Sequence, residues 1–543
     1  MLNMSRRKFL AASAAIPAAA ALPSAGRAQA GQPVRKLSLV TSNAAFDPVR
    51  AEAARLISRS ARSIGLDVEQ NLMDYNAGFQ KVATDHDFDL TIIRFSGTAE
   101  RLDPNVFLSK LYASSEYKPG SFNWTGLKDE KLDAFILKQQ SEMDVEKRRE
   151  IVFAAQKAAF DVHSRSVLVY PANTQAYRSD RVRNLVPGAG EGIGALWTDL
   201  SAEPIGGDGF IRTGATVELK SLNPVAVADN NEIFELRMIY DRLLQVGADG
   251  SIKMWAARDV KLRDPVTIDI QLRENMTFHD GKPVTAEDVK FSIDYHKRWN
   301  APYYLEALSK VAGVTVTASH TLTLRLTEAY APLYFNLLAS IFIIPKHIWQ
   351  TFPESVGVDD PLKWDNPTPV GSGPFKFDYW RRGAELRVSA NTGHFNPPKN
   401  AGILRIVYGS HDALAAAIER NECDRTRYVI KPSLMDALSK VENCVGKAYP
   451  SHGVYDFSYN CVNTPFSDPA LRRAFEHILP KEVIRSVLLS GYADIGGSII
   501  APSNEFWHND DVKPLAEDVQ AARGILSEAG YSWDGGGSLL MPR

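Results

Sequence analysis

Apolar and polar residues follow two patterns along this chain, one typical of buried strands and one typical of amphipathic helices. Residues 87–95 (DFDLTIIRF) are a continuous apolar run that suits a buried strand. Residues 127–140 and 144–163 carry apolar residues every three to four positions, which predicts two amphipathic helices. Because strand and helix patterns alternate along the chain, we expect a mixed α/β (α+β) protein.

The two ends of the chain carry parts of one pattern. Residues 515–530 predict a helix that ends at Gly530, and a glycine-rich turn after it leads toward a strand. Near the other end, residues 36–42 predict a strand, 48–64 a helix and 66–72 a second strand. If the C-terminal segment is placed before the N-terminal one, these segments form one continuous helix–turn–strand–helix–strand unit. We therefore expect a circular permutation that places both ends in one domain.

Short sequence motifs predict several further elements. Thr285 is a predicted helix N-cap, and Asp288 follows three residues later, where its carboxylate can meet the first-turn amides. Asp468 and Pro469 predict a second helix start. Residues 375–391 read as a hairpin, whereas residues 187–215 are rich in glycine and proline and predict a surface connection.

The first thirty residues are typical of an export signal. Arg6 and Arg7 form a twin-arginine pattern, and an alanine-rich apolar run and an Ala28-Gln29-Ala30 cleavage site follow in the expected order. Pro17 and Pro23 interrupt the apolar run, which argues against a membrane anchor. We expect a mature protein in the periplasm that begins near Gly31.

The composition of the chain argues against several kinds of ligand and cofactor. The net charge of −2 on 543 residues gives no support to nucleic-acid binding. Cys423, Cys444 and Cys461 predict buried free thiols, with one disulfide as the alternative. The eleven histidines are scattered, so we expect neither a metal site nor a cofactor. The glycines of residues 190–195 imitate a dinucleotide fingerprint but lack the flanking strand and long helix.

Four stretches carry a resemblance to a known family. They are FHDGKPVTAEDVKFSI, PVGSGPFKFDYWRRGAELRVSAN, YNCVNTPFSDPALRRAFEHILPKEVI and AEDVQAARGILSEAGY. In this mutual order they resemble the family-5 extracytoplasmic solute-binding proteins, the receptors of peptide, opine and nickel ABC importers. The resemblance implies a two-lobed periplasmic binding protein fold of type II with an extra β-rich subdomain, which closes on a ligand by hinge motion.

The order of the blocks departs from the family. The family begins with the block that starts near Ala215 and ends with the block found here at residues 31–205, so the loop at 201–214 joins the old ends. A fusion or gene-model error is the alternative explanation. The resemblance implies one lobe of residues 31–170 plus 455–543, a second of 171–242 plus 366–454 with the hinge strands, and an accessory subdomain of 243–365.

The resemblance implies a periplasmic receptor without catalysis. It would capture a peptide or peptide-like small molecule and deliver it to ABC permease subunits in the inner membrane, as a monomer. Because twin-arginine export often serves cofactor enzymes, a periplasmic enzyme is the alternative, although the sequence contains no triad, P-loop or carboxylate pair that would support it. The identity of the ligand stays open among peptides, opines, other conjugates, oligosaccharides and metal chelates.

The resemblance also implies where a ligand would lie. In peptide-binding members the ligand is an added strand between two edges, which match Asp241 to Leu243 and Ser96-Gly97-Thr98 here. The family often has glycine at the position of Arg242. Glu100 matches an aspartate that holds the ligand α-amino group, with a solvated loop carboxylate as the alternative. Four other residues are candidate pocket walls or contacts, of which the tryptophans could stack on a ligand or, as the alternative, belong to the apolar core: Arg94, Asn123, Trp124 and Trp507.

Overall fold

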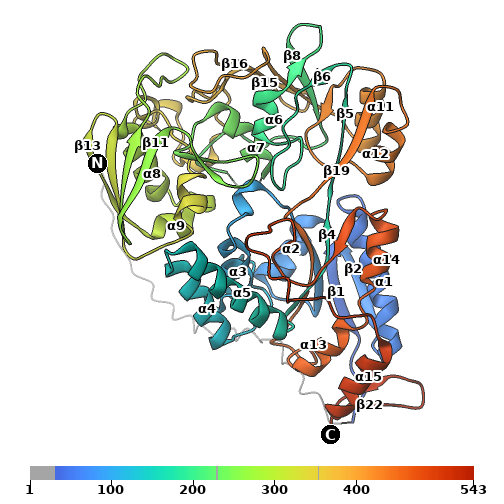
Figure 1. The fold of residues 1–543 in the computed structure, drawn as a ribbon. Coiled ribbons are helices and arrows are strands. Elements are labelled where there is room, and N and C mark those ends of the chain that lie inside the picture. Colours follow the sequence, from blue (N-terminus) through green and yellow to red (C-terminus); the bar gives the residue numbers. More distant parts are fainter. Residues whose placement is uncertain (1–30, 228–229, 353) are drawn as a thin grey trace, which may run out of the picture.

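The computed structural model describes residues 31–227, 230–352 and 354–543 and divides them into two lobes (Figure 1). The predicted export signal lies outside these residues. The end lobe comprises residues 31–171 and 454–543, and the inner lobe comprises residues 173–449. Only two short connections join the lobes, namely Ala172 and residues 450–453. Each lobe has its own sheet and its own apolar core, as in the predicted α/β class.

A six-stranded sheet forms the centre of the end lobe, in the order β2-β1-β3-β20-β4-β21. Its strands are β1 (Leu37–Ser42), β2 (Val68–Met73), β3 (Leu90–Phe95), β4 (Arg165–Pro171), β20 (Val454–Tyr459) and β21 (Ala493–Ile495). β1 is parallel to β2 and β3, whereas β20 is antiparallel to β3 and β4. Five of the six residues of β3 are buried, as its continuous apolar run predicted, because helices cover the sheet.

The helices of the end lobe include those that the sequence predicted at residues 48–64, 127–140, 144–163 and 515–530 and from Pro469, together with others that it did not predict. They are α1 (Pro48–Ala61), α2 (Tyr75–Phe79), α3 (Asn105–Tyr112), α4 (Glu130–Ser141), α5 (Val145–Asp161), α13 (Pro469–Glu476), α14 (Lys481–Val483) and α15 (Val519–Glu528). The carboxylate of Asp468 accepts a hydrogen bond from the amide of Ala470 and caps α13, with Pro469 at its first position. This predicted helix start is confirmed.

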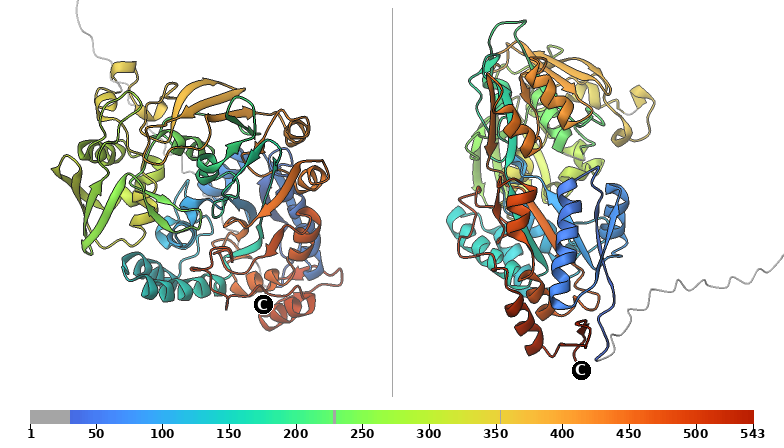
Figure 2. Two further views of the ribbon diagram at one scale, coloured as in Figure 1. Left: turned by 45° about the horizontal axis from the view of Figure 1, so that its top comes forward. Right: turned by 90° about the vertical axis from the view of Figure 1, so that its right-hand side faces the viewer.

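The two ends of the described chain meet in the end lobe. After α15 a small hairpin of β22 (Ser532–Trp533) and β23 (Leu539–Leu540) returns toward the first residues (Figure 2). The amide of Gly31 donates to the Met541 carbonyl at 3.0 Å, and the amide of Val34 donates to the Leu539 carbonyl at 2.8 Å. Leu526 of α15 and Leu37 and Leu39 of β1 belong to one apolar core. The predicted proximity of the two ends is therefore confirmed.

A seven-stranded sheet forms the centre of the inner lobe, in the order β15-β16-β17-β8-β18-β5-β19. Its strands are β5 (Asn173–Arg178), β8 (Phe210–Ala215), β15 (Phe375–Arg381), β16 (Glu385–Ala390), β17 (Gly402–Val407), β18 (Arg425–Thr426) and β19 (Cys444–Tyr449). Its helices are α6 (Leu196–Ser201), α7 (Asn230–Ile239), α11 (His411–Glu419) and α12 (Pro432–Leu438). β15 and β16 form the predicted hairpin.

A β-rich part of the inner lobe packs beside this sheet. It contains the strands β11 (Ala257–Asp264), β12 (Thr267–Leu272), β13 (Val311–Ala318) and β14 (Thr321–Leu326), with α8 (Ala286–Arg298), α9 (Leu305–Ser309) and α10 (Lys346–Trp349). Two short strand pairings complete the lobe: β6 (Val182–Arg183) with β7 (Glu203–Pro204), and β9 (Leu244–Val246) with β10 (Ile252–Met254). The predicted capping box of Thr285 and Asp288 opens α8.

The prediction of a surface connection at residues 187–215 is wrong for most of its length. Asp199 of α6 is fully buried and receives two hydrogen bonds from Arg427, at 2.7 and 2.8 Å. β8 lies in the middle of the seven-stranded sheet. A Cβ atom on Gly192 would lie 2.1 Å from the Gln175 side-chain oxygen, so the glycine permits close packing here rather than exposure.

Candidate functional site

The loop that follows β3 in the end lobe packs against the inner lobe. At its start, a Cβ atom on Gly97 would lie 2.2 Å from the Gly453 amide nitrogen, so only glycine fits against the second connection between the lobes. The loop then forms a short 3₁₀ turn, η3 (Ala99–Arg101). Ala99 and Leu102 pack into the apolar core of the inner lobe. The sequence between Ser96 and Leu102 is therefore a contact surface between the lobes.

A buried network of charges joins the lobes at this loop. The Glu100 carboxylate accepts a hydrogen bond from Arg242 at 3.1 Å, and Arg237 at the end of α7 lies 3.8 Å from the same oxygen. Arg237 also forms two hydrogen bonds with Glu191, at 3.0 and 2.8 Å. Glu191 in turn accepts the amide of Ala99 at 3.1 Å. Two carboxylates and two guanidinium groups thus neutralise each other between the lobes.

The electrostatics keep Glu100 ionised although only 5% of its surface is exposed. Burial acts to raise the pKa of its carboxyl group, but the positive charges of Arg242 and Arg237 outweigh burial and lower that pKa below its usual range. Arg242 is held in turn by the Ala339 carbonyl at 3.0 Å and by the Phe342 ring, whose centroid lies 4.8 Å away. The predicted ligand carboxylate therefore already has cationic partners within the protein.

A cavity of about 100 Å³ lies beside this network, between α3 of the end lobe and the β-rich part of the inner lobe. Six of its polar lining residues are Glu100, Arg101, Lys110, Tyr303, Glu306 and Asn336. Lys110 forms an ion pair with Glu306 at 3.2 Å. Arg101 donates to the carbonyl and hydroxyl oxygens of Ser96, at 2.8 and 3.2 Å. Polar side chains from both lobes thus line the cavity.

The other predicted edge lies close to the network, but its carbonyl groups already have partners. The Asp241 carbonyl accepts the amide of Ile343, and the Leu243 carbonyl accepts the amide of Ala257. The Asp241 carboxylate accepts hydrogen bonds from Trp255 at 2.7 Å and from His394 at 3.1 Å. Arg242, between these two residues, is the one that reaches across to Glu100.

The remaining predicted contacts lie inside the end lobe. Asn123 is buried and donates to the Ala113 carbonyl at 2.8 Å. Trp124 is 1% exposed and stacks on Phe95, with ring centroids 6.2 Å apart. Trp507 is buried, and the guanidinium of Arg148 lies 5.0 Å from the centroid of the tryptophan ring. Arg94 lies over the ring of Tyr455 at 5.6 Å. These four residues do not contact the network of Glu100 in the described part of the chain.

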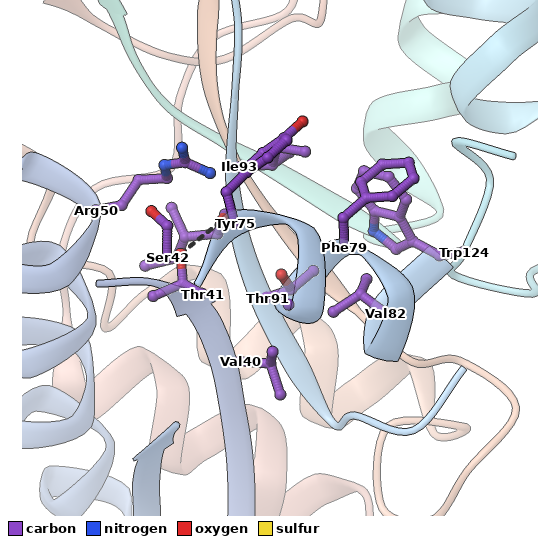
Figure 3. A pocket seen from close by; sticks show the side chains of 12 residues that line it. Val40, Thr41, Ser42, Arg50, Tyr75, Phe79, Val82, Thr91, Ile93 and Trp124 are labelled. Carbon is purple, nitrogen blue, oxygen red and sulfur yellow. Dashed lines mark hydrogen bonds between the residues drawn. The ribbon is translucent and has the colours of Figure 1, made fainter. Parts of the chain in front are cut away.

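Trp124 instead lines a second, smaller cavity at the ends of β1 and β3, shown in Figure 3. Tyr75 and Phe79 of α2 and Arg50 of α1 close it, and its volume of about 30 Å³ is close to that of one water molecule. Trp124 therefore serves the packing of the end lobe here, and whether it also contacts a ligand stays a prediction.

Sequence reasoning missed three members of the network: Arg237, Arg242 as a charge partner, and Glu191. Arg237 carries no local signal beyond its position on a predicted helix, and Glu191 lies within the glycine-rich segment that imitated a nucleotide fingerprint. A charged residue within an apolar stretch of sequence indicates that it forms a buried ion pair. No local pattern, however, could assign Glu191 to Arg237 or Glu100 to Arg242.

Residues 31–227, 230–352 and 354–543 contain no group of three or more His, Cys, Asp or Glu side chains that could hold a metal ion, and no helix long and apolar enough to cross a membrane. The three cysteines are free, and burial raises the pKa of the Cys423 thiol to about 12 and that of Cys461 to about 11. Both thiols are therefore protonated and unreactive near neutral pH.

Known proteins resemble this chain in sequence and fold. The family model "Bacterial extracellular solute-binding proteins, family 5 Middle" matches residues 251–542. The oligopeptide-binding protein AppA of Bacillus subtilis is 25% identical over 345 residues, which cover 62% of this chain and 61% of that protein. The dipeptide-binding protein of Escherichia coli is 23% identical over 54% of this chain and 58% of its own length. The chain thus spans about three fifths of these relatives.

A solved structure gives the same fold. NikZ from Campylobacter jejuni, in complex with Ni(L-His), superposes with a TM-score of 0.50 at 21% identity and covers 61% of this chain and 65% of its own. This similarity concerns the fold and not the ligand.

Proposed function

The chain belongs to family 5 of the bacterial extracellular solute-binding proteins, and we propose that it binds a peptide or peptide-like small molecule between its two lobes. Its mixed α/β architecture is that of the type II peptide-binding proteins. Family-5 proteins are extracytoplasmic binding receptors and not enzymes. We extend this role to the present chain, as a periplasmic receptor that delivers its solute to ABC permease subunits in the inner membrane.

One observation carries the proposal. Among the described residues, the chain passes between the lobes only at Ala172 and at residues 450–453, and polar side chains from both lobes line a cavity between them. Two thin connections allow the lobes to rotate about them, and a solute that contacts both lobes stabilises the closed arrangement. A permease that recognises the closed arrangement then distinguishes the loaded receptor from the empty one.

We also propose that the family blocks stand in a circularly permuted order in this chain. Strands β1 to β4 precede the residues that the family model matches, yet they share a sheet with β20 and β21, which lie within the match. A permuted order would supply the strands of this lobe from the opposite end of the chain.

The receptor function is tested by recovery of a retained solute. Purified full chain is incubated with a mixed metabolite extract, washed and denatured, and the released compounds are identified by mass spectrometry. We expect a compound to be retained and to be recovered chemically unchanged after prolonged incubation with excess protein. Steady conversion of the compound into a product would contradict the proposal and favour a periplasmic enzyme.

A further inference from the structure

Arg101 is the one cavity-lining cation, among the described residues, that has no carboxylate partner. Its guanidinium donates only to the carbonyl and hydroxyl oxygens of Ser96, both uncharged. Lys110, the other cavity-lining cation, pairs with Glu306 at 3.2 Å. Burial lowers the pKa of Arg101, although an arginine remains charged at any physiological pH. The cavity is thus lined by one guanidinium group that forms no ion pair with a carboxylate.

The carboxylates of the same cavity, by contrast, are fully engaged. Glu100 pairs with Arg242 at 3.1 Å. Glu306 accepts hydrogen bonds from Asn105 at 2.8 Å and from Tyr330 at 3.4 Å, besides its ion pair with Lys110. A ligand ammonium would have to displace a buried guanidinium to reach Glu100, and this would leave Arg242 buried without its partner. The site therefore disfavours a cationic group and favours an anionic one.

Two further properties of the cavity determine which chemical group it can bind. A guanidinium presents its donors in a planar fork that matches a carboxylate. The side-chain oxygen of Asn336, which lines the cavity, is buried and accepts no hydrogen bond in the described residues, so it can receive an uncharged N–H or O–H donor. A volume of about 100 Å³ has room for an end group of a few heavy atoms and not for a whole peptide.

We propose that Arg101 binds the carboxylate of the solute, and that Arg242, by holding Glu100, removes any requirement for a free amino group. The solute class is then an anionic peptide-like conjugate whose nitrogen is acylated or otherwise uncharged. This inference rests on the proposed solute-binding function. It makes Arg101 and Arg242 the residues that determine specificity.

The test compares end groups on one set of compounds. A library of di- and tripeptides is prepared in four forms: free, N-acetylated, C-amidated, and blocked at both ends. The library is incubated with the full chain, and the retained compounds are measured by ultrafiltration and mass spectrometry. We expect at least about tenfold stronger retention of forms with a free carboxylate than of the matching amides, and less than about threefold loss upon acetylation.

Variants assign these preferences to residues. Arg101→Gln should abolish the preference for a free carboxylate, whereas Arg101→Lys should keep part of it and the exposed control Arg263→Gln should keep all of it. Arg242→Met should increase the retention of forms with a free amino group, since Glu100 loses its 3.1 Å partner. Circular dichroism checks that each variant is folded. If Arg101→Gln does not fold, the comparison of end forms on the wild-type protein still decides the inference.

Failure of the inference and failure of the function give different results. Equal retention of acids and amides by the wild-type protein, or loss of binding upon acetylation, would overturn the inference and leave the receptor function intact. A folded Arg101→Gln variant that still prefers a free carboxylate would likewise overturn the inference and leave the receptor function intact. Retention of no form in the library by the wild-type protein would count against the peptide-like solute itself and overturn both.

Discussion

At the scale of single residues, Glu100 is the carboxylate of the end lobe that pairs with two arginines of the inner lobe. Replacement by glutamine keeps the size of the side chain but leaves Arg242 and Arg237 with one negative charge fewer in buried surroundings. Because a buried charge without its partner is costly, we expect Glu100→Gln to lower the free energy of unfolding by about 3 kcal/mol. Chemical denaturation measures this, and Glu52→Gln, in an exposed pair with Arg55, should change it by less than about 1 kcal/mol. Equal effects of the two substitutions would contradict the structure.

The same residue predicts a pH dependence. The pKa of Glu100 is lower in the folded chain than its ordinary value of 4.5, so its contribution to stability is complete above that value. The contribution is lost as the pH falls through the lower, folded pKa. We therefore expect the difference in unfolding free energy between wild type and Glu100→Gln to stay constant from pH 7 to about 5 and to shrink below about 4.5. A difference that grows upon acidification would contradict this assignment.

At the scale of elements, α5 holds the loop after β3 in place. Arg148 of α5 forms two hydrogen bonds with Asp103, at 2.8 and 2.7 Å, just before α3 begins, and both side chains are buried. We expect Asp103→Asn to destabilise the protein by about 3–5 kcal/mol and to weaken solute binding, because the loop that carries Glu100 and Arg101 loses its anchor. Denaturation and the retention assay measure both effects. Asp161→Asn, in an exposed pair with Lys157, is the control and should alter neither.

At the scale of the whole molecule, the proposed permutation predicts that the chain can be rejoined and reopened. The amides and carbonyls of residues 31–34 and 539–541 already bond to each other, so a short linker can connect them. The exposed turn at Gly206 and Gly207 has open space around both residues and offers a new break. The rearranged chain should fold and retain the same compounds as the native chain, as measured by circular dichroism and mass spectrometry. A break inside β20, the control, should prevent folding, and failure of the Gly206 break as well would contradict the permutation.

The sequence by itself determined several local elements and the proximity of the chain ends. The apolar run of β3, the cap at Asp468 and the capping box of Thr285 depend on neighbouring residues, so their patterns are readable without the fold. The family resemblance likewise rests on contiguous segments. Tertiary structure alone decided the site: Glu100 and Arg242 are 142 residues apart, and Glu191 lies in a segment whose glycines predicted exposure. The fold buries these charges, and burial makes their pairing obligatory. It leaves the neighbouring Arg101, equally charged in the sequence, without a carboxylate partner in the described chain and open to the cavity.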